Sequence, residues 1–148
     1  MAKMYRHAPL NSIWEGSGNV MALDVLRAGK HIPLFMQEVG LCKGMNPHVD
    51  EYIRKLGNNL HTVLKEDEAR GMKGVHAQLH ARNLVDQMAV GLQASLLLRY
   101  GCPTVTELFI ASRIRNLDGF NSGVNYGSTP FDPSASKHVI MDNMPVYV

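Results

Sequence analysis

One repeat of apolar residues restricts the fold of this sequence more than any other feature. Its members alternate at spacings of four and three residues and are Val49, Ile53, Leu56, Leu60 and Val63. This period places apolar side chains on one face of an α-helix. Asn46-Pro47 marks the start, because asparagine caps helices well and proline suits the first helical position. The segment therefore predicts an amphipathic helix that buries one face.

A longer helical pattern follows after a charged turn at residues 65–70 and continues to about Tyr100. Its apolar stripe consists of Met72, Val75, Leu79, Met88, Leu92 and Leu96. The run Gly101-Cys102-Pro103 stops this helix, because proline cannot continue the backbone hydrogen bonding. We therefore expect a second long helix, with the centre of the core at residues 88–98.

Shorter helices are predicted on either side of these two. The run from Val20 to Ala28 is apolar on nearly all of its faces, so this helix should be buried on several sides. Residues 31–41 indicate a short, irregular helix. Thr104 and Glu107 have the spacing of a capping box, which predicts a helix that continues through about Arg115.

The residues after 115 have a different composition. Gly, Asn, Ser and Pro cluster there without a helical or alternating period, which predicts an extended tail over residues 116–148. No segment of the sequence alternates in the manner of a strand. The predicted fold class is therefore all-α, an antiparallel helical bundle with an irregular C-terminal tail.

The low net charge argues against a nucleic-acid site, and the spacing of cysteines and histidines argues against a metal site. The net charge is only +2, so no strong global field directs the chain toward nucleic acid. Cys42 and Cys102 match no metal-ligand spacing and are predicted to be buried thiols. His76 and His80 lie one helical turn apart but have no evident third ligand. We therefore expect no metal site.

The sequence also lacks the features of a membrane or exported protein. No stretch reaches the ~18 uninterrupted apolar residues of a bilayer span, and the first residues have no apolar signal core. We therefore expect a soluble, intracellular protein without a membrane partner, located in the cytoplasm or the mitochondrial matrix according to its source.

The strongest candidate for a catalytic segment is the loop Trp14-Glu15-Gly16-Ser17-Gly18-Asn19. Its glycines let the backbone approach a ligand closely, and a neighbouring aromatic wall raises the pKa of a carboxylate. A carboxylate with a pKa near neutrality suits the removal of a weakly acidic proton, such as one α to a thioester carbonyl. Taken alone, the loop is explained more simply by a solvated glutamate.

A longer stretch around this loop carries a family resemblance. The run Asn11-Ser12-Ile13-Trp14-Glu15-Gly16-Ser17-Gly18-Asn19-Val20-Met21, followed by Leu23-Asp24-Val25-Leu26-Arg27, resembles the catalytic segment of acyl-CoA dehydrogenases. The AidB-like, adaptive-response branch is the nearest, because tryptophan and asparagine stand where tyrosine and glutamine are more usual. The resemblance implies FAD as cofactor, acyl-CoA as substrate, and a place in fatty-acid metabolism.

The same resemblance assigns roles to the residues of the loop. Glu15 corresponds to the catalytic base that removes the α-proton of the thioester. Ser17 and Asn19 correspond to cofactor-binding residues. Trp14 and Gly16 correspond to substrate-binding residues.

A division of the chain is implied as well. Residues 1–40 correspond to the end of the family's C-terminal helical domain, residues 41–115 to an additional helical domain, and residues 116–148 to the extended tail. The family's N-terminal helical domain and central β domain have no counterpart in this sequence. The chain alone is therefore expected to bind neither FAD nor acyl-CoA well and to be inactive.

Two other functions remain open. As an interaction module, the chain would dock on a second copy or on a full-length enzyme through the apolar run 20–28, so a homo-oligomer is expected. As a DNA-contacting domain, it would use Arg27, which matches a basic family position, and a cluster at residues 54–73. Residues 41–148 contain eleven Lys and Arg against ten Asp and Glu, which gives DNA binding little electrostatic support.

Overall fold

Helices make up the regular structure of this chain. The computed structural model describes residues 6, 18–70, 74–115 and 132–144, and no strand occurs among them. The helices are α2 (Gly18–Arg27), α3 (Ile32–Val39), α4 (Pro47–Arg70), α5 (Val75–Tyr100), α6 (Pro103–Ile110) and α7 (Pro133–Asn143). Short 3-10 turns at Gly29–His31 and Gly40–Cys42 flank α3, and a π-helical turn at Ala111–Arg115 follows α6. The predicted all-α class is confirmed.

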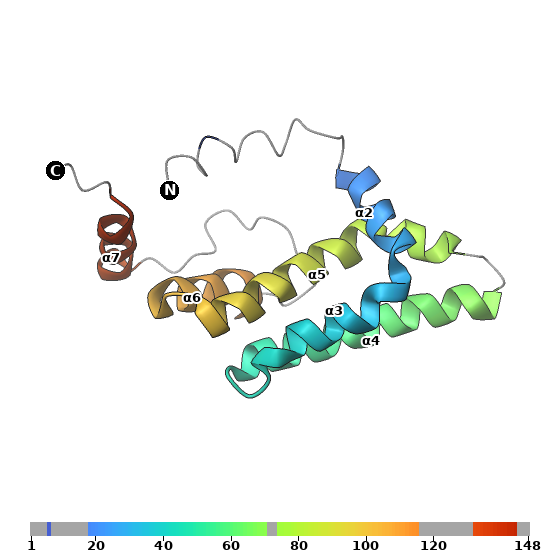
Figure 1. Cartoon of the computed structure of the whole chain (residues 1–148), viewed down its shortest axis with the longest axis horizontal. Coiled ribbons are helices and arrows are strands. Elements are labelled where there is room, and N and C mark those ends of the chain that lie inside the picture. Colours follow the sequence, from blue (N-terminus) through green and yellow to red (C-terminus); the bar gives the residue numbers. More distant parts are fainter. Residues whose placement is uncertain (1–5, 7–17, 71–73, 116–131, 145–148) are drawn as a thin grey trace.

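Helices α4 and α5 lie side by side and run in opposite directions (Figure 1). The predicted repeat of α4 faces α5, with Val49, Leu56 and Leu60 buried. Six buried positions of α5 follow the same alternation of four and three, namely Ala77, Ala81, Leu84, Met88, Gly91 and Ser95, and Gln87 and Ala94 beside this row are buried as well. Two matched repeats of this kind form a seam like that of a coiled coil. The amphipathic helix predicted from the sequence is confirmed.

The buried face of α5 differs from the predicted stripe. Leu79 is 78% exposed and Leu96 is also exposed, whereas Met88 is buried. The true face contains small residues that let α4 approach closely, since a Cβ at Gly91 would lie 3.3 Å from Cδ2 of Leu56. A pattern built on large apolar side chains therefore selected the wrong face.

The core has two parts along the α4–α5 pair. One part, near α6, consists of the buried residues Cys42, Val49, Ala94, Ile110 and Ile114. The other consists of Leu56, Leu60, Leu84 and Met88, with Ile32, Phe35 and Met36 packed against it. Helix α3 thus covers the middle of the pair, which agrees with the irregular helix predicted for residues 31–41.

The ends of the long helices agree only in part with the sequence signals. Oδ1 of Asn46 accepts hydrogen bonds from the backbone N–H of His48 at 3.0 Å and of Val49 at 3.3 Å, which confirms the predicted cap of α4. At the other end, α4 continues to Arg70, so the turn predicted at 65–70 is wrong. Glutamate and alanine favour helices, and the run Glu66 to Ala69 prolongs α4.

The capping box predicted for α6 is also wrong. Cys102 occupies the N-cap position without a side-chain cap, and Pro103 is the first helical residue. The hydroxyl that bridges this corner belongs to Thr106 and donates to the carbonyl oxygens of Leu97 and Cys102 at 3.0 and 2.9 Å. Glu107 instead pairs with Arg115 at 2.6 Å.

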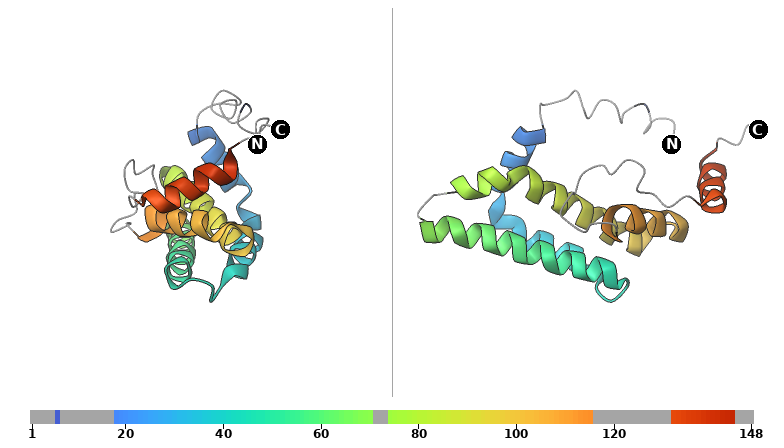
Figure 2. Two further views of the ribbon diagram at one scale, coloured as in Figure 1. Left: turned by 90° about the vertical axis from the view of Figure 1, so that its left-hand side faces the viewer. Right: turned by 180° about the vertical axis from the view of Figure 1, so that it is seen from behind.

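Helix α7 lies within the segment predicted to be an extended tail. Asp132 caps it, because its carboxylate accepts hydrogen bonds from the backbone N–H of Ser134 at 2.9 Å and of Ala135 at 3.1 Å. Pro133 follows in the first helical position. The helix lies at the α6 end of the α4–α5 pair (Figure 2). The extended conformation predicted for residues 133–143 is therefore wrong.

Helix α2 is much more exposed than its sequence predicted. It packs on α5 and buries only Ala22, while Val20 is 50% and Met21 53% exposed. Burial on several sides is therefore not found in the described part of the chain, because α5 covers one side only. Neither α2 nor any other helix of the described ranges is long and apolar enough to cross a membrane.

Candidate functional site

Most of the predicted catalytic loop lies outside the described residues. Trp14, Glu15, Gly16 and Ser17 belong to the undescribed range 7–17, so their predicted roles remain predictions. The structure describes the chain again from Gly18, where α2 begins. Asn19 is exposed in the first turn of this helix.

Arg82 of α5 lies directly against the start of α2. A Cβ added at Gly18 would collide with Nη1 of Arg82, the far end of a flexible side chain, so a larger residue here would displace the guanidinium. Nε of Arg82 donates to Oδ2 of Asp86 at 2.9 Å. A guanidinium beside a helix N-terminus favours a nearby anion, because the helix dipole has the same sign. No sequence motif indicated Arg82, since the packing of α2 on α5 brings it to the start of α2.

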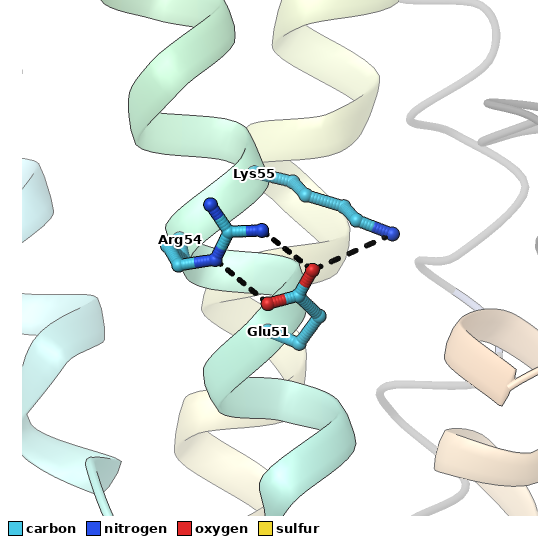
Figure 3. A network of polar contacts seen from close by, with 3 residues as sticks. All are labelled: Glu51, Arg54 and Lys55. Atoms are coloured by element: carbon cyan, nitrogen blue, oxygen red, sulfur yellow. Dashed lines mark hydrogen bonds and ion pairs between the residues drawn. The ribbon is translucent and has the colours of Figure 1, made fainter.

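Three of the basic residues suggested for DNA contact, Arg27, Arg54 and Lys55, have acidic neighbours. Arg27 is exposed and pairs with Asp24 on the same helix. On α4, Glu51 accepts from Arg54 at 2.7 Å and lies 3.7 Å from Nζ of Lys55 (Figure 3). The hydrogen bond from Arg54 lowers the pKa of the Glu51 carboxyl. These pairs offset the positive charge that a phosphate backbone would need.

Side-chain amides connect α4 to α5 beside a pocket, and among them Gln87 is buried. Gln87 accepts a hydrogen bond from Nδ2 of Asn59 at 3.1 Å, and it donates to Asn83. The hydroxyl of Tyr52 donates to the backbone carbonyl of Gln87 at 3.1 Å. Burial raises the pKa of this phenol. A pocket of about 270 Å³ lies beside these side chains. Amides are poor acids and bases, so this network positions the helices and supplies no acid–base chemistry.

Three potential metal ligands meet near α7, although the sequence predicted no metal site. One ligand atom each from Cys102, His138 and Asp142 lies within 4.8 Å of the other two. Nε2 of His138 is 3.2 Å from Oδ2 of Asp142, one turn further along α7. The i, i+4 spacing of this pair was a signal in the sequence. No spacing in the sequence indicated the third ligand, Cys102, because it comes from the α5–α6 corner.

The two cysteines differ in their surroundings. Cys42 is buried, as predicted, and its thiol donates to the carbonyl of Val39 at 3.3 Å. Cys102 is exposed, so the prediction of a buried thiol is wrong at this position. The corner before Pro103 places the side chain of residue 102 outside the core.

Comparison with known proteins gives one relative. The chain is 39% identical over 71 residues to AidB of Escherichia coli (strain K12), an acyl-CoA dehydrogenase-like protein. The match covers 45% of this chain and 13% of that relative. No family model matches the chain, and no solved structure matches it significantly. The resemblance predicted from the sequence is thereby confirmed as a similarity to AidB over these 71 residues.

Proposed function

We propose that this chain is the C-terminal part of an FAD-dependent acyl-CoA dehydrogenase that forms an α,β-double bond in an acyl-CoA thioester. The observation that carries the proposal is the 39% identity to AidB. The run from Asn11 to Arg27, which resembles the family's catalytic segment, adds the position of the site. The redox step in such an enzyme belongs to the cofactor, and the protein supplies proton transfer and orientation.

In this proposal, the Glu15 carboxylate removes the α-proton of the bound thioester. The Glu15 backbone N–H donates to the thioester carbonyl, where negative charge develops as the proton leaves. Trp14 and Gly16 form part of the substrate pocket. When FAD is bound, it supplies the acceptor for the β-hydrogen.

The start of α2 supports the proposed cofactor contacts. Asn19 is exposed in the first turn, and the Arg82 guanidinium lies against Gly18. A helix N-terminus with an exposed amide and an adjacent cation suits an anionic diphosphate. Ser17 and Asn19 are therefore proposed to hold the diphosphate region of FAD, with Arg82 as a charged neighbour.

The chain supplies only part of such an enzyme, since it covers 13% of its relative. We therefore propose that the isolated chain binds FAD and acyl-CoA weakly and has no turnover. Purification with added FAD should give a colourless protein that does not reduce a dye with acyl-CoA. A stoichiometrically yellow chain, or dye reduction by it, would contradict this part of the proposal.

A chimera tests the role of Glu15 directly. The matching segment of AidB is replaced by this chain, and dye reduction with a series of acyl-CoA thioesters is measured. Glu15→Gln should lower the rate by about 10²-fold or more, the usual contribution of a general base, while the flavin absorbance stays. Glu51→Gln on the exposed side of α4 is the matched control. Equal rates in the Glu15→Gln and the unsubstituted chimera would show that Glu15 is not the base that removes the α-proton.

One observation supports a second candidate, a helical interaction module. Val20, Met21 and Val25 of α2 are exposed together, on a helix that α5 covers from one side. Clustered apolar side chains of this kind favour association. We propose a second copy of the chain as the partner. The DNA-contacting alternative gains no such support, because Arg27, Arg54 and Lys55 have acidic partners.

A further inference from the structure

The corner between α5 and α6 and the exposed helix α7 bring together a set of side chains that the proposed function does not use. They are Cys102, His138 and Asp142, and their ligand atoms all lie within 4.8 Å of one another. We propose that these three residues bind a zinc ion. The proposal is independent of the acyl-CoA dehydrogenase assignment.

The spacing of the ligand atoms fits tetrahedral coordination. Zinc lies about 2.0–2.3 Å from nitrogen, oxygen and sulfur ligands, so two of its ligand atoms are about 3.3–3.6 Å apart in a tetrahedron. Nε2 of His138 and Oδ2 of Asp142 are 3.2 Å apart, close to that value. The Cys102 sulfur, within 4.8 Å of both, needs to move by about 1 Å to complete the triangle.

The chemistry of the three groups favours zinc over other common ions. Thiolate and imidazole are ligands of zinc, whereas magnesium and calcium prefer oxygen ligands alone. The three side chains are at least partly accessible, so an ion can enter from solvent. Three protein ligands leave a fourth position for water. His138 also lines an open pocket of about 430 Å³ between α6 and α7, which has room for that water.

A metal link also accounts for the position of α7. No residue of this helix is buried, and Ile140 and Met141 are exposed. Apolar packing therefore contributes little to holding α7 against α6. A zinc ion shared by Cys102 and the two α7 ligands would fasten the helix to the corner of the bundle. Binding requires the thiol to lose its proton, so metal affinity should fall as the pH is lowered.

The test uses the full chain, freed of metal with a chelator. Titration with zinc should give one ion per chain by calorimetry. Cobalt, as a spectroscopic substitute, should give visible absorption of a tetrahedral site and a thiolate-to-cobalt charge-transfer band. Cys102→Ser should remove that band. His138→Ala and Asp142→Asn should each weaken binding about tenfold or more. No cobalt–thiolate band in the unsubstituted chain would overturn the proposal.

Controls separate this site from other thiols and histidines. His48→Ala, on the exposed start of α4, should bind zinc as the unsubstituted chain does. Because Cys42 is buried in the core, its role is tested without substitution, by alkylation and mass spectrometry. Zinc should protect Cys102 from alkylation, and His138→Ala should abolish the protection. Unchanged zinc affinity in Cys102→Ser, or no protection by zinc, would contradict the proposed ligand set.

Discussion

Gly91 of α5 faces Leu56 of α4 so closely that an added Cβ would lie 3.3 Å from Cδ2 of Leu56 and 3.6 Å from Cε1 of Tyr52. Leu56 is 1% exposed and belongs to the core, so it has little room to move. The distance between the two long helices is therefore set at the position of this glycine. A larger residue there requires either Leu56 to shift by a few tenths of an ångström or α4 and α5 to separate.

Two glycine substitutions test this relationship. Gly91→Val should lower the free energy of unfolding by about 1–3 kcal/mol, the usual range for overpacking. Gly57→Ala should raise it by about 0.5–1 kcal/mol, because alanine favours the helix and the added Cβ meets only the flexible methyl end of Met36. Urea unfolding of both variants gives the values. A stabilised Gly91→Val variant would contradict the close seam.

Two leucines distinguish the observed face of α5 from the face predicted by the sequence. Leu84 is 4% exposed in the core, whereas Leu79 is 78% exposed. Leu84→Ala should lower the free energy of unfolding by about 2–5 kcal/mol, and Leu79→Ala should change it by less than about 0.5 kcal/mol. Chemical denaturation measures both. A larger loss of unfolding free energy from Leu79→Ala than from Leu84→Ala would instead support the stripe predicted from the sequence.

These positions show what the sequence could predict about the fold. The face of α4 was predictable because its buried residues are large and apolar, from Val49 to Leu60. The face of α5 was not, because its buried positions include alanines, Gly91 and Ser95, whose small size matters only when another helix lies against them. The local cap at Asn46 was predicted correctly, whereas the capping box at Thr104 and Glu107 was not, because Pro103 already begins α6.

The candidate sites also differ in how far the sequence could predict them. The catalytic loop could be proposed from the sequence because its residues are consecutive, from Asn11 onward, and its role stays a prediction. Arg82 and Cys102 could not be placed, since their neighbours come from distant segments through the packing of α2 on α5 and of α7 on α6. Asp132-Pro133 was a readable start for α7, but the polar composition around it masked the signal.

The start of α7 should depend on pH. The hydrogen bond from Ser134 is the main cause that lowers the pKa of Asp132 in the folded chain. A lowered pKa means that the stabilisation is present above the unfolded pKa and is lost as the pH falls through the folded one. NMR chemical shifts of residues 133–143 should therefore report loss of helix on acidification. In Asp132→Ala the helix should already be weaker at neutral pH.

A control for this titration is Ser136→Ala, which keeps the capping carboxylate. It should show the same acid transition as the unsubstituted chain. If Asp132→Ala retained the shifts of the unsubstituted chain at neutral pH, the cap would not contribute to the stability of α7.

Self-association should depend on α2. Met21 is 53% exposed beside Val25, and a charge there would oppose the burial of this side against a second copy. Light scattering at about 1 mg/mL should give a mass above that of one chain, and Met21→Lys should shift it toward the monomer. Leu34→Lys is the control, because this exposed leucine lies on α3. A monomeric unsubstituted chain would contradict association through α2.

The absence of buried residues in α7 has a consequence for the dynamics of the chain. In the metal-free chain, opening of this helix exposes almost no additional apolar surface, so its free energy of opening is set by its own hydrogen bonds and not by the core. Amide hydrogen exchange should then divide the chain into two cooperative units, with α7 exchanging early and the α4–α5 pair exchanging only on global unfolding.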